Sequence, residues 1–277
     1  MKFKNGSSPT SVVESNNVPP LFPGKMDIGS IKKSERSQSE KIVLYAPEGW
    51  GKTTWASKSE APVFLSTEDG LKNVVVDKFP SPEGWLDVFS AIESLRMQDH
   101  HFKTLVIDTA DWTEHLCQSF LLARDNMKSI EDYGYGKGYV VAFEEWKRLV
   151  SPVDKLRDEK GMSVIFLAHS AIKTFNNPSG ENYDRYEMKM DRRVSTLLKE
   201  WADCVLFGNY DVAIDVKKGQ LKGKGFGGDR IIHTNYSPAF DAKNRYGIKD
   251  SISADFNEFW NLVKGGVSNG TKTEAKN

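Results

Sequence analysis

Cysteine is scarce in this 277-residue chain, and long apolar runs are missing. The two cysteines, Cys117 and Cys204, lie far apart and belong to no CxxC or Cys/His cluster, so we expect reduced core thiols and no structural zinc. No run approaches the roughly 18 apolar residues that a membrane helix needs. The N-terminus has no apolar segment typical of a secretory signal. These absences predict a cytoplasmic protein that does not bind a membrane.

An excess of charge of either sign is also lacking. Lys and Arg number 38, as do Asp and Glu, so any binding to nucleic acid would need a local basic surface. There is no internal repeat, and the length suits one large α/β domain. Both ends are polar and without periodic apolar residues, which predicts flexible tails at 1–38 and 265–277 around a domain at 39–264.

Apolar strand candidates alternate with helical patterns inside this domain. The strand candidates are 41–45, 62–66, 104–108, 162–167 and 203–208, and the helix candidates are 52–58, 85–97, 112–126 and 140–160. Such alternation predicts an α/β fold with a mostly parallel central sheet flanked by helices. Short strand-like pieces at 210–216 and 230–234 predict antiparallel strands at one edge, before a closing helix at 256–263.

The first strand candidate runs directly into a segment with the spacing of a phosphate-binding loop: Ala46, Pro47, Glu48, Gly49, Trp50, Gly51, Lys52, Thr53 and Thr54. The consensus is Gly, four residues, then Gly-Lys-Ser/Thr, and Ala46 takes the place of the first Gly. Lys52 would reach the β and γ oxygens of ATP, and the Thr53 hydroxyl would bind Mg²⁺. The alternative is a glycine-containing turn before a surface helix. The upstream apolar strand favours the nucleotide site.

Two carboxylates follow strand candidates and complete this hypothesis. Thr104–Asp108 is an apolar strand that ends in an acid, the Walker B pattern, so we expect Asp108 to bind Mg²⁺ through water. Glu68 lies just past the strand at 62–66, where it could activate the attacking water. Asp69 and Asp111 are alternative general bases, and a solvated acidic turn is the structural alternative.

His169 follows the strand candidate at 162–167. A polar residue at this strand end can sense the γ-phosphate, although a lone histidine there is often only structural. The residue is assigned to the nucleotide site by its position in the predicted sheet.

Two aromatic and basic segments predict a surface for single-stranded DNA. One is the glycine-rich loop at 133–139, and the other is a long polar loop at 171–190. Aromatic rings can stack on bases while cations contact phosphates. The residues that we expect to bind DNA are Tyr135, Lys137, Lys173, Arg185 and Lys189. A lid or a subunit contact is the alternative, and the basic turn at 217–224 is either a hairpin loop or a further phosphate contact.

Lys243 and Arg245 lie late in the domain, two residues apart. They form either an ordinary surface turn or a pair of cations that reaches the nucleotide of a neighbouring subunit and neutralises charge in the transition state.

Taken together, the chain from about 40 to 262 resembles phage ATPases that have a RecA-like core and assist single-strand annealing, the Sak-four type. The motifs that carry the resemblance are APEGWGKT, FLSTEDG, TLVIDTAD, YGYGKGY, FLAHS and KNRYG. KNRYG is also similar to the Lys-Asn-Arg-Phe-Gly motif of RadA/Sms proteins and to the Lys-x-Arg element of hexameric helicases. In those families the pair acts across a subunit interface, which implies the same role for Lys243 and Arg245.

The resemblance further implies slow, assembly-stimulated ATP hydrolysis, a homo-oligomeric ring or filament on single-stranded DNA, and service in phage recombination beside a single-strand DNA-binding protein. The chain departs from the pattern at Ala46, at His169, where RecA has Gln, and in both long loops. Two rival functions stay open: a helicase-loader or packaging-type motor, and a monomeric P-loop kinase for small molecules.

Overall fold

The computed structural model describes residues 28–31, 33, 39–68, 70–71, 74–211 and 228–265. The chain divides into two units, Met1–Arg36 and Ser37–Asn277. The described part of the first contains a short 3-10 turn, η1 (Ile28–Ser30). The predicted tails at 1–38 and 265–277 fall almost entirely outside the described residues. None of the helices described is long and apolar enough to cross a membrane.

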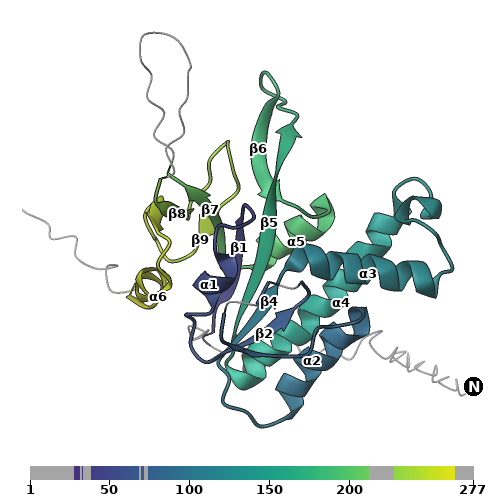
Figure 1. The fold of residues 1–277 in the computed structure, drawn as a ribbon, viewed down its shortest axis with the longest axis horizontal. Coiled ribbons are helices and arrows are strands. Elements are labelled where there is room, and N and C mark those ends of the chain that lie inside the picture. Colours follow the sequence, from purple (N-terminus) through teal and green to yellow (C-terminus); the bar gives the residue numbers. More distant parts are fainter. Residues whose placement is uncertain are drawn as a thin grey trace, which may run out of the picture. The chain divides into compact units, whose positions relative to one another are not determined.

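The described strands of the second unit form one sheet (Figure 1). They are β1 (Lys41–Ala46), β2 (Pro62–Ser66), β3 (Asp77–Lys78), β4 (Thr104–Asp108), β5 (Ser163–Phe175), β6 (Tyr183–Met188), β7 (Cys204–Tyr210), β8 (Arg230–His233), β9 (Lys243–Asn244) and β10 (Ser251–Ser253). Their order is β10-β8-β7-β1-β5-β4-β2-β3, with β6 paired to β5 and β9 to β7. From β7 to β3 all neighbours are parallel, whereas β8, β9 and β10 add antiparallel pairs at the β7 edge.

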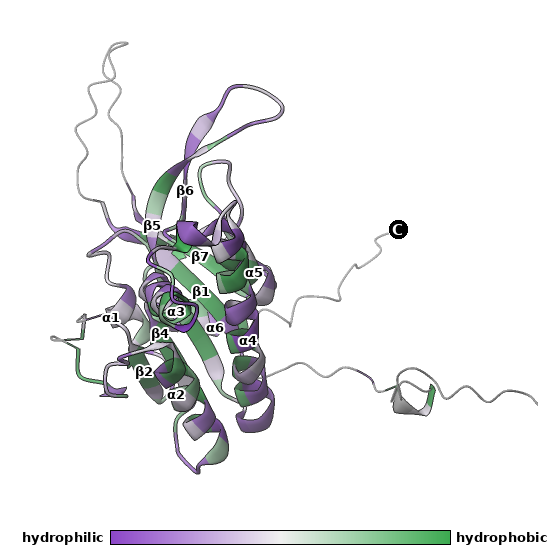
Figure 2. Ribbon diagram, turned by 90° about the vertical axis from the view of Figure 1, so that its right-hand side faces the viewer, coloured by the Kyte–Doolittle hydropathy of each residue, from purple (hydrophilic) through white to green (hydrophobic). Residues whose placement is uncertain are grey.

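Helices cover both faces of this sheet. They are α1 (Lys52–Ala56), α2 (Trp85–Met97), α3 (Ala110–Arg124), α4 (Lys137–Lys160), α5 (Arg192–Trp201) and α6 (Phe256–Gly265), with the 3-10 turn η2 (Ile130–Tyr133) before α4. Successive strand side chains point to opposite faces, so Val43 and Tyr45 pack under α2, α3, α4 and α5, while Ile42 and Leu44 pack under α1 and α6. Figure 2 shows the apolar strands between helices whose outer surfaces are largely hydrophilic.

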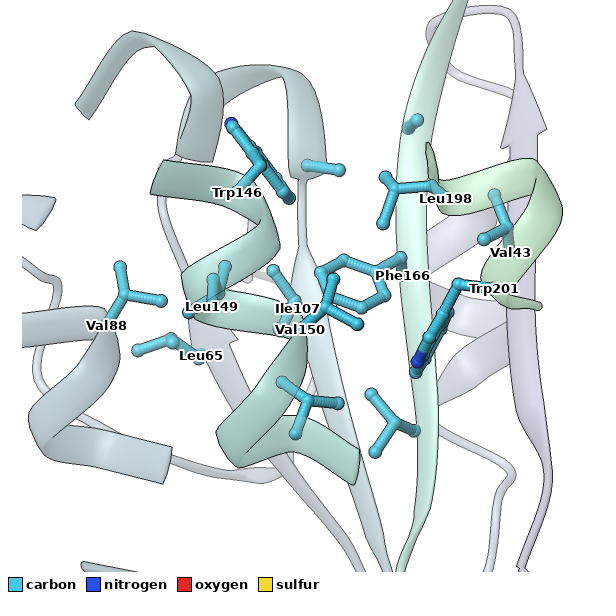
Figure 3. Packing of buried hydrophobic residues seen from close by; sticks show 14 of the residues in the cluster. Val43, Leu65, Val88, Ile107, Trp146, Leu149, Val150, Phe166, Leu198 and Trp201 are labelled. Carbon is cyan, nitrogen blue, oxygen red and sulfur yellow. The ribbon is translucent and has the colours of Figure 1, made fainter. Parts of the chain in front are cut away.

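Aromatic side chains tie α4 and α5 to the middle of the sheet (Figure 3). The ring of Phe166 on β5 lies 6.3 Å from that of Trp146 on α4 and 5.4 Å from that of Trp201 on α5. Phe166 and Trp146 are fully buried, and burial of such a side chain stabilises the fold by about 1.5–3 kcal/mol. These contacts hold α4 and α5 against β5 at the centre of the sheet.

The fold class predicted from the sequence is confirmed: an α/β fold with a mostly parallel central sheet, helices on both faces and antiparallel strands at one edge. Each of the five strand candidates is a strand, and the helix predicted at 85–97 has the same bounds as α2. The strand piece predicted at 210–216 and the basic turn at 217–224 lie, apart from Tyr210 and Asp211, outside the described residues.

The prediction of a long polar loop at 171–190 is wrong. Strand β5 continues to Phe175 and pairs with β6 in an antiparallel hairpin, from Ser170 opposite Met188 to Phe175 opposite Tyr183. The hairpin projects beyond the carboxyl ends of the parallel strands (Figure 1). Because most of it stands outside the sheet, the side chains of 171–175 alternate between half-buried and exposed, and on β6 only Arg185 and Met188 are buried, so the apolar signal of a core strand is missing.

Helix α5 was not predicted, although the sequence contains its signals. Val194, Leu198 and Trp201 lie on one face at helical spacing and are buried. The carboxylate of Asp191 accepts a hydrogen bond from the backbone nitrogen of Arg193 at 2.9 Å, which caps the helix at its start.

The glycine-rich segment at 133–139 is shorter as a loop than predicted, because α4 already begins at Lys137. Gly134, Tyr135 and Gly136 all have positive φ, at 74°, 48° and 70°. Glycine adopts this left-handed conformation without a Cβ clash. The tight turn leaves the Tyr135 side chain fully exposed.

Candidate nucleotide-binding site

The loop between β1 and α1 is anchored at its centre by Trp50. The Trp50 side chain is fully buried, and its Nε1 donates a hydrogen bond to the backbone oxygen of Asn209 at 2.9 Å. Its ring lies on Gly208 of β7, where a Cβ atom would approach the ring carbons Cε2 and Cζ2 to 2.7 and 2.8 Å. The loop therefore keeps its shape through a contact with the neighbouring strand.

Lys52 is folded into this loop. Only 6% of the residue is exposed, and its Nζ donates to the backbone oxygens of Ala46 at 3.3 Å and Pro47 at 3.2 Å. Burial lowers the pKa of the ammonium group, and the nearby carboxylates of Asp108 and Asp111 oppose that effect. A buried cation inside a loop of backbone amides is suited to binding an anion such as phosphate.

Thr53 and Asp108 meet beside Lys52. The Thr53 hydroxyl donates to Oδ2 of Asp108 at 2.7 Å, while the buried Oδ1 of Asp108 has no hydrogen-bond partner among the described residues. Burial raises the pKa of this carboxyl, although the Thr53 hydroxyl and Lys52 counteract it. A hydroxyl and a carboxylate with a free buried oxygen fit Mg²⁺, which prefers oxygen ligands and retains several waters.

Glu68, His169 and Asp111 form a chain of polar side chains at the same sheet edge. The Nδ1 of His169 lies 2.8 Å from Oδ2 of Asp111, and its Nε2 lies 4.0 Å from Oε1 of Glu68. Burial raises the pKa of Glu68, and His169 opposes this. Asp111, one of the alternative bases, is buried and its carboxylate is hydrogen-bonded to His169. Asp69 lies outside the described residues.

A parallel strand that breaks into a Gly-Lys-Thr loop, with a Walker B carboxylate at the end of β4, defines a P-loop NTPase. In this sheet β5 separates the phosphate-loop strand β1 from β4, which carries the Walker B carboxylate. Residues 38–246 match the AAA_24 family, described as an AAA domain, so the chain belongs to that family. P-loop ATPases bind and hydrolyse nucleotides as a class, usually with Mg²⁺.

Among curated proteins, no match was found. Among solved structures, the chain is similar to one described as "Crystal structure of the RadB recombinase", with 13% identity and a TM-score of 0.39 over 70% of this chain and 80% of that one. At this level the likeness says nothing about what the chain does.

The residues expected to bind DNA differ in their placement. Tyr135 and Lys137 are exposed, and Lys189 is exposed near Glu48 of the phosphate loop, with 3.6 Å between Nζ and Oε1. Arg185 is only 5% exposed, and its Nη2 lies 2.5 Å from Oδ1 of Asp241. The structure thus places Arg185 in the middle of the β5–β6 hairpin, opposite Lys173, with its side chain buried against Asp241.

Further hydrogen bonds link the β5–β6 hairpin to residues 190–191, which follow it, and link those residues to α3. Lys173 donates from Nζ to the backbone oxygen of Met190 at 2.8 Å. The buried carboxylate of Glu114 on α3 accepts from the backbone nitrogen of Asp191 at 3.2 and 3.1 Å. Burial raises the pKa of Glu114 to about 7. These contacts occupy Lys173 as well as Arg185.

Lys243 and Arg245 lie at the opposite end of the sheet from the phosphate loop. Asn244 pairs with Cys204 at the start of β7, and Cys204 pairs with Ile42 near the start of β1. Because β1 runs for six residues towards the loop, at about 3.3 Å each, the pair is displaced from the loop by roughly the length of that strand. Arg245 forms an ion pair with Asp203 at 2.9 Å and keeps 60% of its side chain exposed.

Sequence reasoning missed three residues that shape the site: Asp111 as the partner of His169, Gly208 under Trp50, and Arg230. The Nη1 of Arg230 donates to the backbone oxygen of Trp50 at 3.1 Å. No local motif marks Gly208 or Arg230, because each contacts the loop from more than a hundred residues away in the chain. Asp111 had a local signal, since it opens α3 just after the Walker B strand.

Replacing Gly208 with Ala should shift the phosphate loop. The added Cβ would overlap the Trp50 ring, and overpacking a core of this kind costs about 1–3 kcal/mol. We expect a lower free energy of unfolding together with weaker nucleotide binding, measured by chemical denaturation and by titration with a fluorescent ATP analogue. Gly84→Ala is the matched control, because a Cβ at Gly84 meets nothing within 4 Å. Unchanged nucleotide affinity in Gly208→Ala would show that Trp50 does not position the loop.

Proposed function

We propose that the protein binds ATP and Mg²⁺ at the Ala46–Thr53 loop, hydrolyses the ATP, and thereby controls its own assembly on single-stranded DNA. In this proposal it serves phage homologous recombination by strand annealing. The bond between Thr53 and Asp108 beside the buried Lys52 is the observation that carries the nucleotide part, because it brings metal and phosphate ligands together.

Each side chain of the site has a role in this proposal. Lys52 and the loop amides hold the phosphates, and Thr53 and Asp108 hold Mg²⁺. When bound, Mg²⁺ neutralises charge on the phosphate oxygens. Glu68 accepts the proton of the attacking water, and the rise of its pKa on burial makes its carboxylate a better base.

Two exposed features at the carboxyl edge of the sheet support a DNA surface. One is the turn that presents Tyr135, followed by Lys137 at the start of α4. The other is the β5–β6 hairpin, whose base presents Lys189 and leads to the exposed Arg192 and Arg193 of α5. An exposed aromatic ring and several cations suit stacking on bases and contact with phosphates. Arg185 and Lys173 are left out of the proposed surface because their side chains are occupied.

Assembly is supported by the position of Lys243 and Arg245 and by the resemblance of KNRYG to motifs that act across subunits. A ring or filament would bring this end of one copy to the phosphate loop of the next. The resemblance to annealing ATPases supports a single-strand DNA-binding protein as a further partner.

Binding of a fluorescent oligonucleotide, followed by anisotropy with and without ATP and Mg²⁺, tests the DNA part. We expect binding whose affinity falls as salt rises, because bound phosphates release counterions. Tyr135→Ala should weaken binding about tenfold, since base–aromatic stacking is worth about 1–3 kcal/mol. Lys155→Ala, which removes an exposed cation farther along the same helix, is the control.

Absence of binding to any oligonucleotide at low salt, with or without ATP, would contradict the DNA part and favour a small-molecule kinase. Movement along duplex DNA would instead favour a packaging-type motor. In either case nucleotide binding at Lys52 is measured separately, so the two parts of the proposal can fail independently.

A further inference from the structure

Asp111 makes two hydrogen bonds to one residue, His169. Its Oδ1 accepts from the backbone nitrogen of His169 at 3.0 Å, and its Oδ2 lies 2.8 Å from the ring Nδ1. Asp111 belongs to the first turn of α3, and His169 is the β5 residue paired with Ala46 at the start of the phosphate loop. A single carboxylate therefore fixes both the backbone and the ring of His169 beside the nucleotide site.

The surroundings of Asp111 keep it ionised. It is only 5% exposed, and burial alone would raise the pKa of its carboxyl. The hydrogen bonds from the ring and backbone of His169 outweigh that effect and lower the pKa below its usual value. Its place in the first turn of a helix adds to this, because negative charge is favoured there. An ionised carboxylate accepts hydrogen bonds and has none to donate.

An acceptor at this position selects one form of the histidine ring. Since Asp111 can only accept, Nδ1 must carry a proton, and in the neutral ring Nε2 is then the unprotonated nitrogen. Nε2 lies 4.0 Å from Oε1 of Glu68, too far for a direct hydrogen bond. The ring and the candidate base can instead share a water molecule between them.

We propose that Asp111 is a positioning residue, which holds the His169 ring as the Nδ1–H tautomer so that Nε2 accepts a hydrogen bond from the water that Glu68 activates. This inference rests on the proposed hydrolysis of ATP. It gives His169 a different role from a phosphate sensor, because contact of Nε2 with a phosphate oxygen would require a doubly protonated ring.

Hydrogen bonds also fix the segment that carries Glu68 relative to the start of α3, which carries Asp111. Thr67, next to Glu68, accepts a hydrogen bond on its Oγ1 from the Thr109 backbone nitrogen at 3.1 Å and donates one to the Thr109 backbone oxygen at 3.0 Å. The Ser66 hydroxyl donates to the Glu68 backbone oxygen at 2.7 Å. The segment that carries Glu68 is therefore linked to the start of the helix that carries Asp111, and the three side chains keep their relative positions.

Asp111→Asn tests the proposal, because Asn has the same shape and its amide nitrogen can donate to Nδ1, which moves the ring proton to Nε2. We expect at least a tenfold loss in kcat of ATP hydrolysis, with the affinity for ATP unchanged within about twofold, because Asp111 touches no phosphate-binding group. Asp125→Asn, the same change at the other end of α3, is the control and should hydrolyse ATP at the wild-type rate.

A second measurement tests the tautomer in the wild-type protein and does not require the Asp111→Asn variant. Nitrogen-15 NMR of the wild-type protein, with the signals of His169 identified by their loss in His169→Gln, should show a protonated Nδ1 and an unprotonated Nε2. A protonated Nε2 with a bare Nδ1 would overturn the proposal, and so would full activity of Asp111→Asn. If the wild-type protein failed to hydrolyse ATP, the proposed function would fall, while the tautomer would still be decided by this spectrum.

Discussion

Lys52→Ala should reduce ATP turnover by about 10²–10³-fold, the loss found when one fixed charge-stabilising donor is removed from an active site. The ammonium group is buried within the loop and held by two backbone oxygens, so no other described cation of this chain occupies that position. The affinity for ATP should fall as well, because the contact with the phosphates exists in the ground state. Phosphate release and equilibrium binding of a fluorescent ATP analogue measure the two effects.

The matched control is Lys58→Ala, which removes an exposed lysine just after α1. It should leave turnover unchanged. The fold of Lys52→Ala should survive, because the removed side chain spans the loop and takes no part in the two apolar clusters of the sheet. A cooperative thermal unfolding transition in both variants would establish this. Wild-type turnover in Lys52→Ala would contradict the assignment of the nucleotide site to this loop.

The parts of the site that the sequence predicted are those whose signal is contiguous. The phosphate loop follows its strand directly, and Asp108 ends an apolar strand of its own. Each of these motifs lies in or directly after one apolar strand, so a short stretch of sequence contains the whole signal. For the same reason the parallel strands were found: buried on both faces, they stand out as apolar runs.

What the sequence could not predict depends on contacts between distant residues. His169 and Asp111 are 58 residues apart, and Arg230 and Trp50 are 180 apart, so no spacing rule joins them. The β5–β6 hairpin escaped notice for a different reason. Its arms stand clear of the sheet and carry polar residues on both faces, which makes a strand look like a loop.

Arg185 illustrates how burial changes the interpretation of a residue. In the sequence it is one cation among aromatic residues, a pattern that suits DNA. In the structure its guanidinium carbon lies 5.5 Å from the ring centre of Phe175, in the same segment, and 5.5 Å from that of Tyr236, farther along the chain. Asp241 completes its environment. The sequence predicted that Arg185 contacts DNA phosphate, whereas in the structure its contacts lie within the protein.

Arg245→Ala subunits should lose most of their ATP turnover and regain part of it when mixed with Glu68→Gln subunits. The physical reason is distance: Arg245 lies near the start of β1, while the phosphate loop follows the other end of that strand, so Arg245 cannot reach the nucleotide of its own chain. In a ring or filament with repeating head-to-tail contacts, an intact site needs Glu68 from one copy and Arg245 from the next. At equal amounts, random assembly would therefore restore about a quarter of the interfaces.

Turnover measured across mixing ratios should pass through a maximum near equal amounts and fall to the residual level of each variant towards either pure sample. Arg148→Ala, which removes an exposed arginine paired with Glu145 on α4, replaces Arg245→Ala in the control series, and its mixtures should lose activity only in proportion to the share of Glu68→Gln. Size-exclusion chromatography must show that each mixture still assembles. Assembled mixtures without any recovery would contradict a role for Arg245 in trans. Wild-type turnover by Arg245→Ala alone would show that the Arg245 charge has no part in the reaction. Its ion pair with Asp203 would then have only a structural role at the edge of the sheet.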